Sequence, residues 1–272
     1  MKSDLKQEHK IPSTNVPVFL KQIGKRNRMQ KMTKRNSVFL MGIISVLLIM
    51  SIYVSPASAV SSSMLGKTHN ISNAAKICFG KPHPKIDWSN CNVGHIEIHF
   101  SDMTGANLSG IITKNPLFYN VNLSDANLQN SVLSRGDFSY ANLSGADLRG
   151  ADLRNIDFYH ANLSGADLRG ANTLGARFVG VEFSNAQLSG IDMSHTNIIG
   201  ADFTGANLQN TILVGADMRS ATFVNANLRG ADLQGSDVNG GSFANSDLTG
   251  TNVKGISNSG VDMSCHGNPI CR

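Results

Sequence analysis

The stretch ANLSGADLRGADLRNIDFYHANLSGADLRG, residues 141–170, decides the fold because it repeats one five-residue pattern six times. Each unit carries a small residue, Ala in five of the six, and two places later a Leu or Phe. In extended backbone, residues two places apart point to the same side, so these two side chains face one interior. The pattern runs without insertion or deletion from Ile86 to Cys265. So strict a repeat predicts a solenoid with a binding surface rather than an enzyme with a pocket.

A second period, of 20 residues, predicts how many units close one coil. The large inward place repeats at that spacing in three tracks: Leu108, Leu128, Leu148, Leu168, Leu188, Leu208, Leu228 and Leu248; Phe118, Phe138, Phe158 and Phe178; and Phe183, Phe203, Phe223 and Phe243. Stacked coils place like side chains above one another at about 4.8 Å. We therefore predict an all-β, four-sided parallel β-helix of nine coils, about 43 Å long, with a dry core of Leu, Phe and Ala.

The last place of each unit is predicted to be a tight turn. It is Gly or Asn in most units, and a turn with positive φ suits Gly and is tolerated by Asn, Asp and His. Arg135, Tyr140 and Ser220 occupy the same place without that tolerance. Either strained backbone or a different turn type is expected at these three corners.

The repeat is irregular near its beginning and its end. Ile111, Thr113, Pro116 and Val121 take inward places, and because Pro lacks an N–H, a local widening is expected around the second coil. The inward hydroxyls of Thr113 and Thr173 must bond to backbone. Asn258 at a large inward place indicates that the stack is finishing.

Charge separates residues 1–59 from the rest. They carry a net charge of +8, whereas the remaining residues carry −3, giving +5 overall. The basic balance therefore belongs to the leader, and direct binding of nucleic acid is not expected.

The leader has the features of a secretory signal. A basic segment precedes the apolar stretch Val38–Val54, and Ala57–Ala59 supplies a small-x-small cleavage pattern, which predicts cleavage after Ala59 and a periplasmic or secreted protein. The alternative is an uncleaved anchor in the inner membrane, because the 17 apolar residues reach the lower limit for spanning a bilayer. The basic segment is long, so translation from Met29 or Met32 is an alternative to Met1.

Four cysteines suit an oxidising compartment. Cys91 lies in the first predicted coil and Cys265 in the last, roughly 38 Å apart, whereas a disulfide needs Cα atoms within about 7 Å. Geometry therefore predicts the pairs Cys78–Cys91 and Cys265–Cys271. We expect an N-terminal cap at 60–85, with a short helix over Ser72–Cys78, the β-helix at 86–265 and a C-terminal cap at 266–272.

A metal site is the alternative to a disulfide for Cys78 and Cys91. Cys78, His83, Cys91 and His95 gather around the first cap, but their spacing matches no familiar zinc pattern. Catalysis has no better support, because His95, His99, His160 and His195 lie on different edges and form no base–nucleophile pair. No enzyme activity, metal or cofactor is predicted.

Units such as Ala146–Gly150 and Ala166–Gly170 resemble the pentapeptide-repeat family, over about two-thirds of the chain. The resemblance implies a right-handed quadrilateral β-helix. Some members are acidic dimeric rods that mimic duplex DNA and regulate DNA gyrase. This chain differs in its export signal, in the predicted disulfide loop at the end where those proteins dimerise, and in arginines that dilute its charge.

Charge and aromatic residues indicate where a partner binds. The face centred on Met103, Leu123, Leu143, Leu163, Phe183, Phe203, Phe223, Phe243 and Met263 carries Asp102, Asp125, Glu182, Asp202 and Asp262 and no Lys or Arg, a net charge of −5. The preceding face nets −3 and bears Tyr119, Tyr140 and Tyr159. Two simpler explanations remain: the acidic residues keep the β-helix soluble, and the tyrosines are residues that favour β-strands. We predict an exported scaffold, monomer or weak dimer, that binds a basic protein; the alternatives are a gyrase regulator and a secreted effector.

Overall fold

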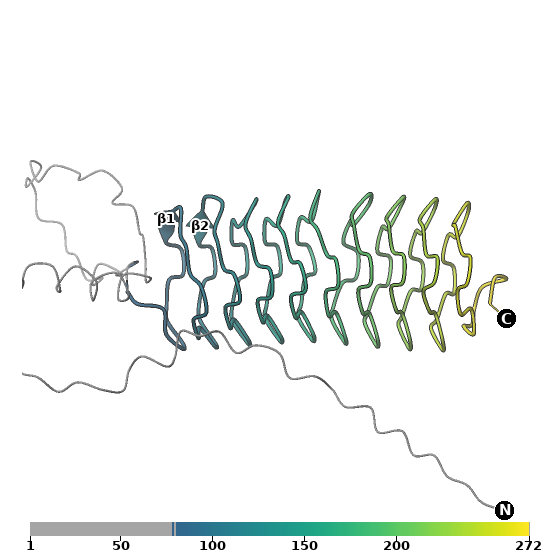
Figure 1. Cartoon of the computed structure of the whole chain (residues 1–272), viewed down its shortest axis with the longest axis horizontal. Coiled ribbons are helices and arrows are strands. Elements are labelled where there is room, and N and C mark those ends of the chain that lie inside the picture. The colour runs from purple at the N-terminus through teal and green to yellow at the C-terminus, as the bar shows by residue number, and fades with distance from the viewer. Residues whose placement is uncertain (1–77, 79, 272) are drawn as a thin grey trace, which may run out of the picture. The chain divides into compact units, whose positions relative to one another are not determined.

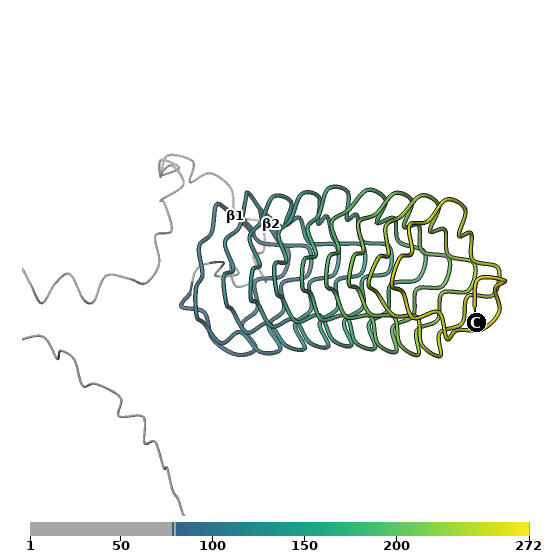
Figure 2. The same cartoon turned by 45° about the vertical axis from the view of Figure 1, so that its right-hand side comes forward.

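The computed structural model describes residues 78 and 80–271, and the leader with its apolar stretch lies outside them, as does most of the expected Ser72–Cys78 helix. Parallel bridges join residues 20 apart in series, from Asp87 with Asn107 to Ser242 with Asp262. One coil therefore takes 20 residues, and the coils follow one another in chain order (Figures 1 and 2). The fold is a four-sided parallel β-helix. No helix long and apolar enough for a bilayer occurs among the described residues.

Backbone hydrogen bonds explain why five residues are enough for each side. In the unit Ala146–Gly150, Asp147 N donates to Ala126 O of the coil before at 2.9 Å. Leu148 N donates to Asp167 O at 2.8 Å and Gly150 N to Arg169 O at 3.2 Å, both in the coil after.

The other two N–H groups of this unit are satisfied locally. Ala146 N donates to Leu143 O at 3.0 Å and so closes the preceding turn. Arg149 N donates to Asp147 Oδ1 at 3.2 Å. All five donors thus have partners, which is the condition for a stable backbone in a dry stack. The last bond explains why Asp or Asn so often stands between the two inward residues.

The core consists of side-chain columns along the axis. The Phe rings of one column stack with centroid distances of 4.9, 5.5 and 5.6 Å from Phe118 to Phe178. Those of the next column stack at 4.9, 4.8 and 4.7 Å from Phe183 to Phe243, and the columns meet at Phe178 and Phe183, 5.4 Å apart. The Leu column is fully buried from Leu108 to Leu248. This packing supplies most of the apolar burial that stabilises the fold.

The corners share one backbone conformation whatever their side chain. Arg135, Tyr140 and Ser220 have φ values of 61°, 59° and 58°, the same region that the glycine corners occupy. Phe100 joins them with a φ of 50°. Of the two possibilities left open above, strained backbone is the one found, because bulky side chains rarely adopt this region.

The irregular start of the repeat perturbs the ladder only locally. Strands β1 (Asn92–Gly94) and β2 (Ile112–Thr113) pair in parallel, and their register shifts between Asn92 and Gly94. Pro116 is buried, and pairing has returned to the 20-residue spacing by Glu97. The hydroxyls of Thr113 and Thr173 donate to the backbone oxygens of Val132 and Asp192, at 2.8 and 2.6 Å.

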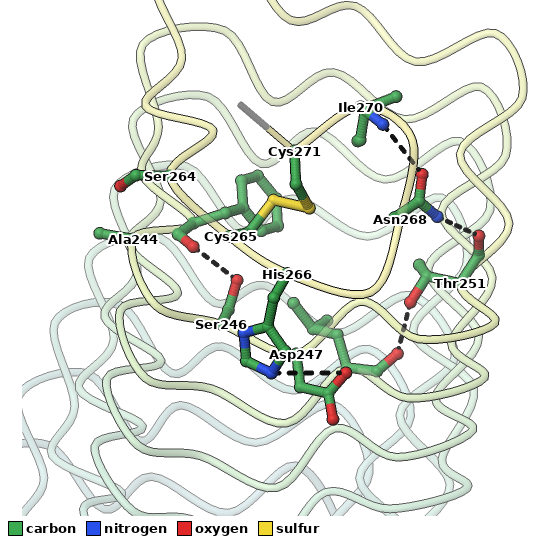
Figure 3. Close-up of a disulfide and its surroundings, with 12 residues drawn as sticks. Ala244, Ser246, Asp247, Thr251, Ser264, Cys265, His266, Asn268, Ile270 and Cys271 are labelled. Carbon is green, nitrogen blue, oxygen red and sulfur yellow. Dashed lines mark hydrogen bonds and ion pairs between the residues drawn. A yellow bond between two sulfur atoms is a disulfide. The ribbon is translucent and has the colours of Figure 1, made fainter.

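Disulfides lie at both ends of the described body. Cys78 pairs with Cys91, and Cys265 with Cys271. The C-terminal loop folds over the last coil, where Leu248 N donates to His266 O at 2.9 Å. Asn268 Nδ2 donates to Thr251 O at 2.9 Å (Figure 3). The loop therefore covers backbone groups that an open end would leave free for pairing with another chain.

Removing the C-terminal disulfide should loosen this cap. The substitution Cys271→Ser together with Cys265→Ser is expected to lower the free energy of unfolding by about 2 kcal/mol, because the bond closes only a short loop. Denaturant unfolding of the oxidised protein and the variant measures the difference. Reducing the variant should then lower its free energy of unfolding only by the contribution of the Cys78–Cys91 disulfide. Equal stability of variant and oxidised protein would contradict a fastening role for the loop.

Candidate functional site

On three sides of the β-helix, six arginines are paired with aspartates. The usual pair joins the second and fourth places of one unit, as in Arg149 with Asp147 at 2.6 Å and Arg154 with Asp152 at 2.7 Å. The remaining pairs are Arg169 with Asp167, Arg177 with Asp157, Arg219 with Asp217 and Arg229 with Asp247. These carboxylates also cap turns, and the pKa values of Asp147 and Asp152 lie below normal chiefly because of hydrogen bonds from their arginines. Most charge on these sides is thus compensated within the chain.

The fourth side, which we call the acidic face, has no such compensation. It consists of the units that begin at residues 101, 121, 141 and so on to 261, which contain no Lys or Arg. Its carboxylates are Asp102, Asp125, Glu182, Asp202 and Asp262, and among the described residues none of them forms an ion pair. The Thr104 hydroxyl, 2.6 Å away, holds the pKa of Asp102 below its usual range, and Ser264 acts likewise on Asp262. Both are ionised at neutral pH.

The negative charge of the acidic face is not needed for the hydrogen bonds that close its turns. Asp202 Oδ1 accepts from Thr204 N at 2.9 Å and so closes its turn. Asn142 and Asn162 do the same for Ser144 and Ser164, at 3.1 and 2.9 Å, with a neutral amide oxygen. Because Asn meets the need of the turn, the negative charge at position 202 is not required by the fold.

The acidic residues are unevenly spread along the face. Glu182 and Asp202 bridge to one another in neighbouring coils, so two like charges lie side by side without a cation between them among the described residues. Asp102 and Asp262 lie in the first and the last coils, far from this pair. Asp125 sits at a corner with a φ of 57°, where its side chain covers Gly145. The structure therefore brings together only the central two of the five predicted carboxylates.

The predicted tyrosines form a continuous cluster on the neighbouring face, which we call the aromatic edge. Its members are His99, Phe100, Tyr119, Tyr140, Tyr159 and His160. The Tyr140 ring lies 5.6 Å from both Tyr119 and Tyr159, and edge-on to each. The His160 ring stacks on Tyr140 at 5.8 Å. The three tyrosines thus act as one surface rather than as three isolated side chains.

Phe100 of this cluster, and Arg177, which stacks on Tyr159 of it, were not predicted from the sequence. The Phe100 ring lies 5.7 Å from Tyr119, and its side chain is the most exposed large apolar one described. The Arg177 guanidinium lies 4.6 Å above the centre of the Tyr159 ring. The signal for Phe100 was present in the sequence, because it occupies the corner column of Tyr140, two coils earlier.

The alternative metal ligands are engaged otherwise. The sulfurs of Cys78 and Cys91 are bonded to each other. His83 Nδ1 lies 2.8 Å from Pro84 O, and His95 Nε2 lies 2.9 Å from Glu97, which raises the pKa of His95. Among the described residues, no three His, Cys, Asp or Glu side chains are grouped to hold a metal ion.

Comparisons with known proteins concern the repeat. A family model for pentapeptide repeats matches in eight copies, at residues 117–158, 161–198, 201–240 and 226–264, more than half of the chain. HetL, involved in heterocyst differentiation regulation in the cyanobacterium Nostoc sp. strain PCC 7120, is 25% identical, covering 66% of this chain and 88% of its own, with a TM-score of 0.40.

Two structures of QnrB1, a plasmid-mediated fluoroquinolone resistance protein, are also similar. Its full-length form is 22% identical, covering 65% of this chain and 93% of its own, with a TM-score of 0.43. A trypsin-treated variant is 20% identical, covering 61% and 91%, with a TM-score of 0.47. None of the curated protein sequences matches this chain. These structural similarities do not identify a binding partner for this chain.

Acid should weaken the β-helix through the turn-capping aspartates. Hydrogen bonds from Thr249, then from Arg229, lower the pKa of Asp247 to about 2, below the value of about 3.9 in an unfolded chain. A lowered pKa stabilises the folded state above pH 4, and the contribution is lost as the pH falls from about 4 to 2. Thermal unfolding between pH 7 and pH 2 should show this decline. Asp247→Asn should be less stable at pH 7 and decline less steeply, and identical slopes would refute the assignment.

Proposed function

Because this chain belongs to the pentapeptide-repeat family, whose fold is a right-handed quadrilateral β-helix, we propose that it is an exported, non-enzymatic scaffold that binds a basic protein through its acidic face. Pentapeptide-repeat proteins are generally structural or interaction proteins. The observation that carries the proposal is a side of the β-helix whose carboxylates have no counter-ions in their own units, although every other side contains Lys or Arg.

Physical considerations favour binding over simple solvation for this face. Like charges on neighbouring β-strands repel one another and lower the stability of the fold. Glu182 and Asp202 lie in this position in adjacent coils. Asn would cap the turn at position 202 equally well, as at Asn142 and Asn162. A basic partner removes the repulsion, and a rigid surface binds with little loss of conformational entropy.

Export is supported by the leader and by the cysteines. The basic segment, the apolar stretch and the small-x-small pattern before Val60 form a secretory signal. Two disulfides that fasten the described body suit an oxidising compartment. Both arguments are independent of the identity of the partner.

Cell fractionation and sequencing of the mature N-terminus test export. The protein is expected outside the cytoplasm with a first residue near Val60, because cleavage follows Ala59. An intact leader on membrane-bound protein would favour the anchor. A cytosolic protein with reduced cysteines would overturn the proposal and favour the regulator of a topoisomerase.

Neutralising the centre of the acidic face tests the binding role. The double variant Glu182→Gln/Asp202→Asn should keep the fold, because amide oxygens replace the carboxylates. It should reduce cross-linking to the basic partner in intact cells by about tenfold. The matched control Asp192→Asn/Asp232→Asn removes the same charge from another side and should cross-link normally. An equal effect of both variants would indicate general electrostatics and contradict a specific face.

A further inference from the structure

We propose that the aromatic edge anchors arginine side chains of an extended basic polypeptide, stacking their guanidinium groups on tyrosine rings beside carboxylates. The inference rests on the proposed interaction function and deepens it by naming the anchoring residues and the side chain they bind. It differs from the acidic face in its residues, so the two can be tested separately.

The edge is an ordered surface that crosses several coils. Its rings touch in series, with Phe100 and Tyr119 5.7 Å apart and Tyr119 and Tyr140 5.6 Å apart. Tyr140 and Tyr159 follow at 5.6 Å, and Tyr159 and His160 at 4.3 Å. Side chains two places apart in an extended peptide are separated by about 7 Å, so alternate residues of such a peptide can reach successive rings.

Two members of the edge are held at an energetic cost that the fold does not require. Phe100 and Tyr140 stand at corners with φ values of 50° and 59°, a region that bulky residues rarely adopt. Both remain outside the core, with 73% and 45% of their surface exposed. Asn120, between them in the same column, makes the same turn at a φ of 53°. Strain kept at an exposed residue that Asn could replace is typical of a functional site.

The chain itself contains an example of the proposed contact. The Arg177 guanidinium lies 4.6 Å above the Tyr159 ring, and its Nη1 lies 2.7 Å from Asp157 Oδ2. One arginine thus stacks on a tyrosine and pairs with an aspartate at the same time. Arg suits this arrangement better than Lys, because its planar guanidinium both stacks and forms directional hydrogen bonds.

The rest of the edge offers the same elements to a second arginine. Asp137 lies one coil before Asp157 in the same column, and its Oδ1 accepts a turn hydrogen bond from Ser139 N at 2.8 Å. Among residues 78 and 80–271, Asp137 forms no ion pair. Among the described residues, no guanidinium stacks on Tyr119 or Tyr140. Beyond His160 the corner column continues as Gly180, whose place for a side chain is blocked by the His160 ring, so the edge ends there.

The surroundings favour a basic polypeptide over other ligands with which aromatic rings interact. The face keeps a net charge of −3 even with Arg177 and Arg219 counted, and this charge repels the phosphates of a nucleic acid. Phe100 and the three tyrosines meet at interplanar angles of 70°, 75° and 89°, so these four rings form no coplanar platform for a sugar or a base, and His160 is the member stacked on Tyr140. A single tyrosine ring beside a carboxylate already holds a cation in this chain, where Arg177 lies over Tyr159 and pairs with Asp157.

Fluorine NMR of the full chain labelled with 3-fluorotyrosine tests the proposal. Three of the four tyrosines lie on the edge. The fourth, Tyr53, belongs to the leader, so its resonance is an internal reference in the uncleaved chain and is absent after cleavage at Ala59. The probes are the peptides acetyl-Arg-Ser-Arg-Ser-Arg-Ser-amide and its Lys counterpart. The Arg peptide should shift the resonances of Tyr119, Tyr140 and Tyr159 saturably and bind at least about fivefold more tightly than the Lys peptide. Equal binding of the two peptides, or no shift with either, overturns the proposal.

The variant Tyr140→Asn separates binding from folding. Asn suits the positive φ, so the melting temperature should stay the same or rise, whereas affinity for the Arg peptide should fall about tenfold. The control Ser220→Asn relieves the same backbone conformation in the same column, away from the rings, and should bind normally. Normal binding by Tyr140→Asn overturns the proposal.

Three further outcomes distinguish the aromatic edge from the acidic face and from a carbohydrate site. Loss of Arg-peptide binding in Glu182→Gln/Asp202→Asn, with normal binding by Tyr140→Asn, would overturn the aromatic anchor and leave the proposed acidic-face function standing. Tyrosine shifts with the neutral oligosaccharide chitohexaose, but not with the Arg peptide, would overturn the proposal in favour of a carbohydrate site. Loss in Tyr140→Asn alone would support the anchor and count against the acidic face as the contact.

Discussion

Hydrogen bonding between coils 20 residues apart is the constraint on which the rest of the structure depends. In a five-residue side, three N–H groups bond to neighbouring coils, one closes a turn and one is capped by the Asp or Asn of its own unit. Any change in unit length would break these bonds along a whole side. The constraint explains the strict repeat, the Asx residue and the uniform corners together.

The same constraint divides the side chains into those that hold the fold and those that are free. Inward places fill columns such as that of Phe183 to Phe243, where each ring rests on the next. Outward places must only remain soluble and, at the Asx place, accept one hydrogen bond. Charge and aromatic residues on the outside can therefore vary without loss of the core. An uncompensated acidic face and a strained aromatic edge are then informative, because the fold would accept simpler residues.

The sequence predicted the features that follow from the repeat. It did not predict features that depend on the conformation of individual side chains. Periods of five and 20 determine the coil, the columns and the cysteine pairing, since each follows from distance along the axis. The backbone conformation at Tyr140 could not be predicted, because a strained corner and a different turn type are both compatible with the same sequence. Phe100 was missed although it occupies the same corner column as Tyr140 and shares its positive φ. The pairing of Arg149 with Asp147 depends on rotamers that spacing alone does not determine.

Cross-linking between outward places tests the 20-residue coil most directly. Cysteines introduced at Asn142 and Asn162, which bridge one another in neighbouring coils, should oxidise to a disulfide in the folded protein, because their backbones lie within bonding reach. Cysteines at Asn142 and Asp152 stand half a coil apart, on opposite sides, and should stay reduced. Peptide mapping by mass spectrometry distinguishes the two. Oxidation of the second pair in preference to the first would contradict the coil length and everything built on it.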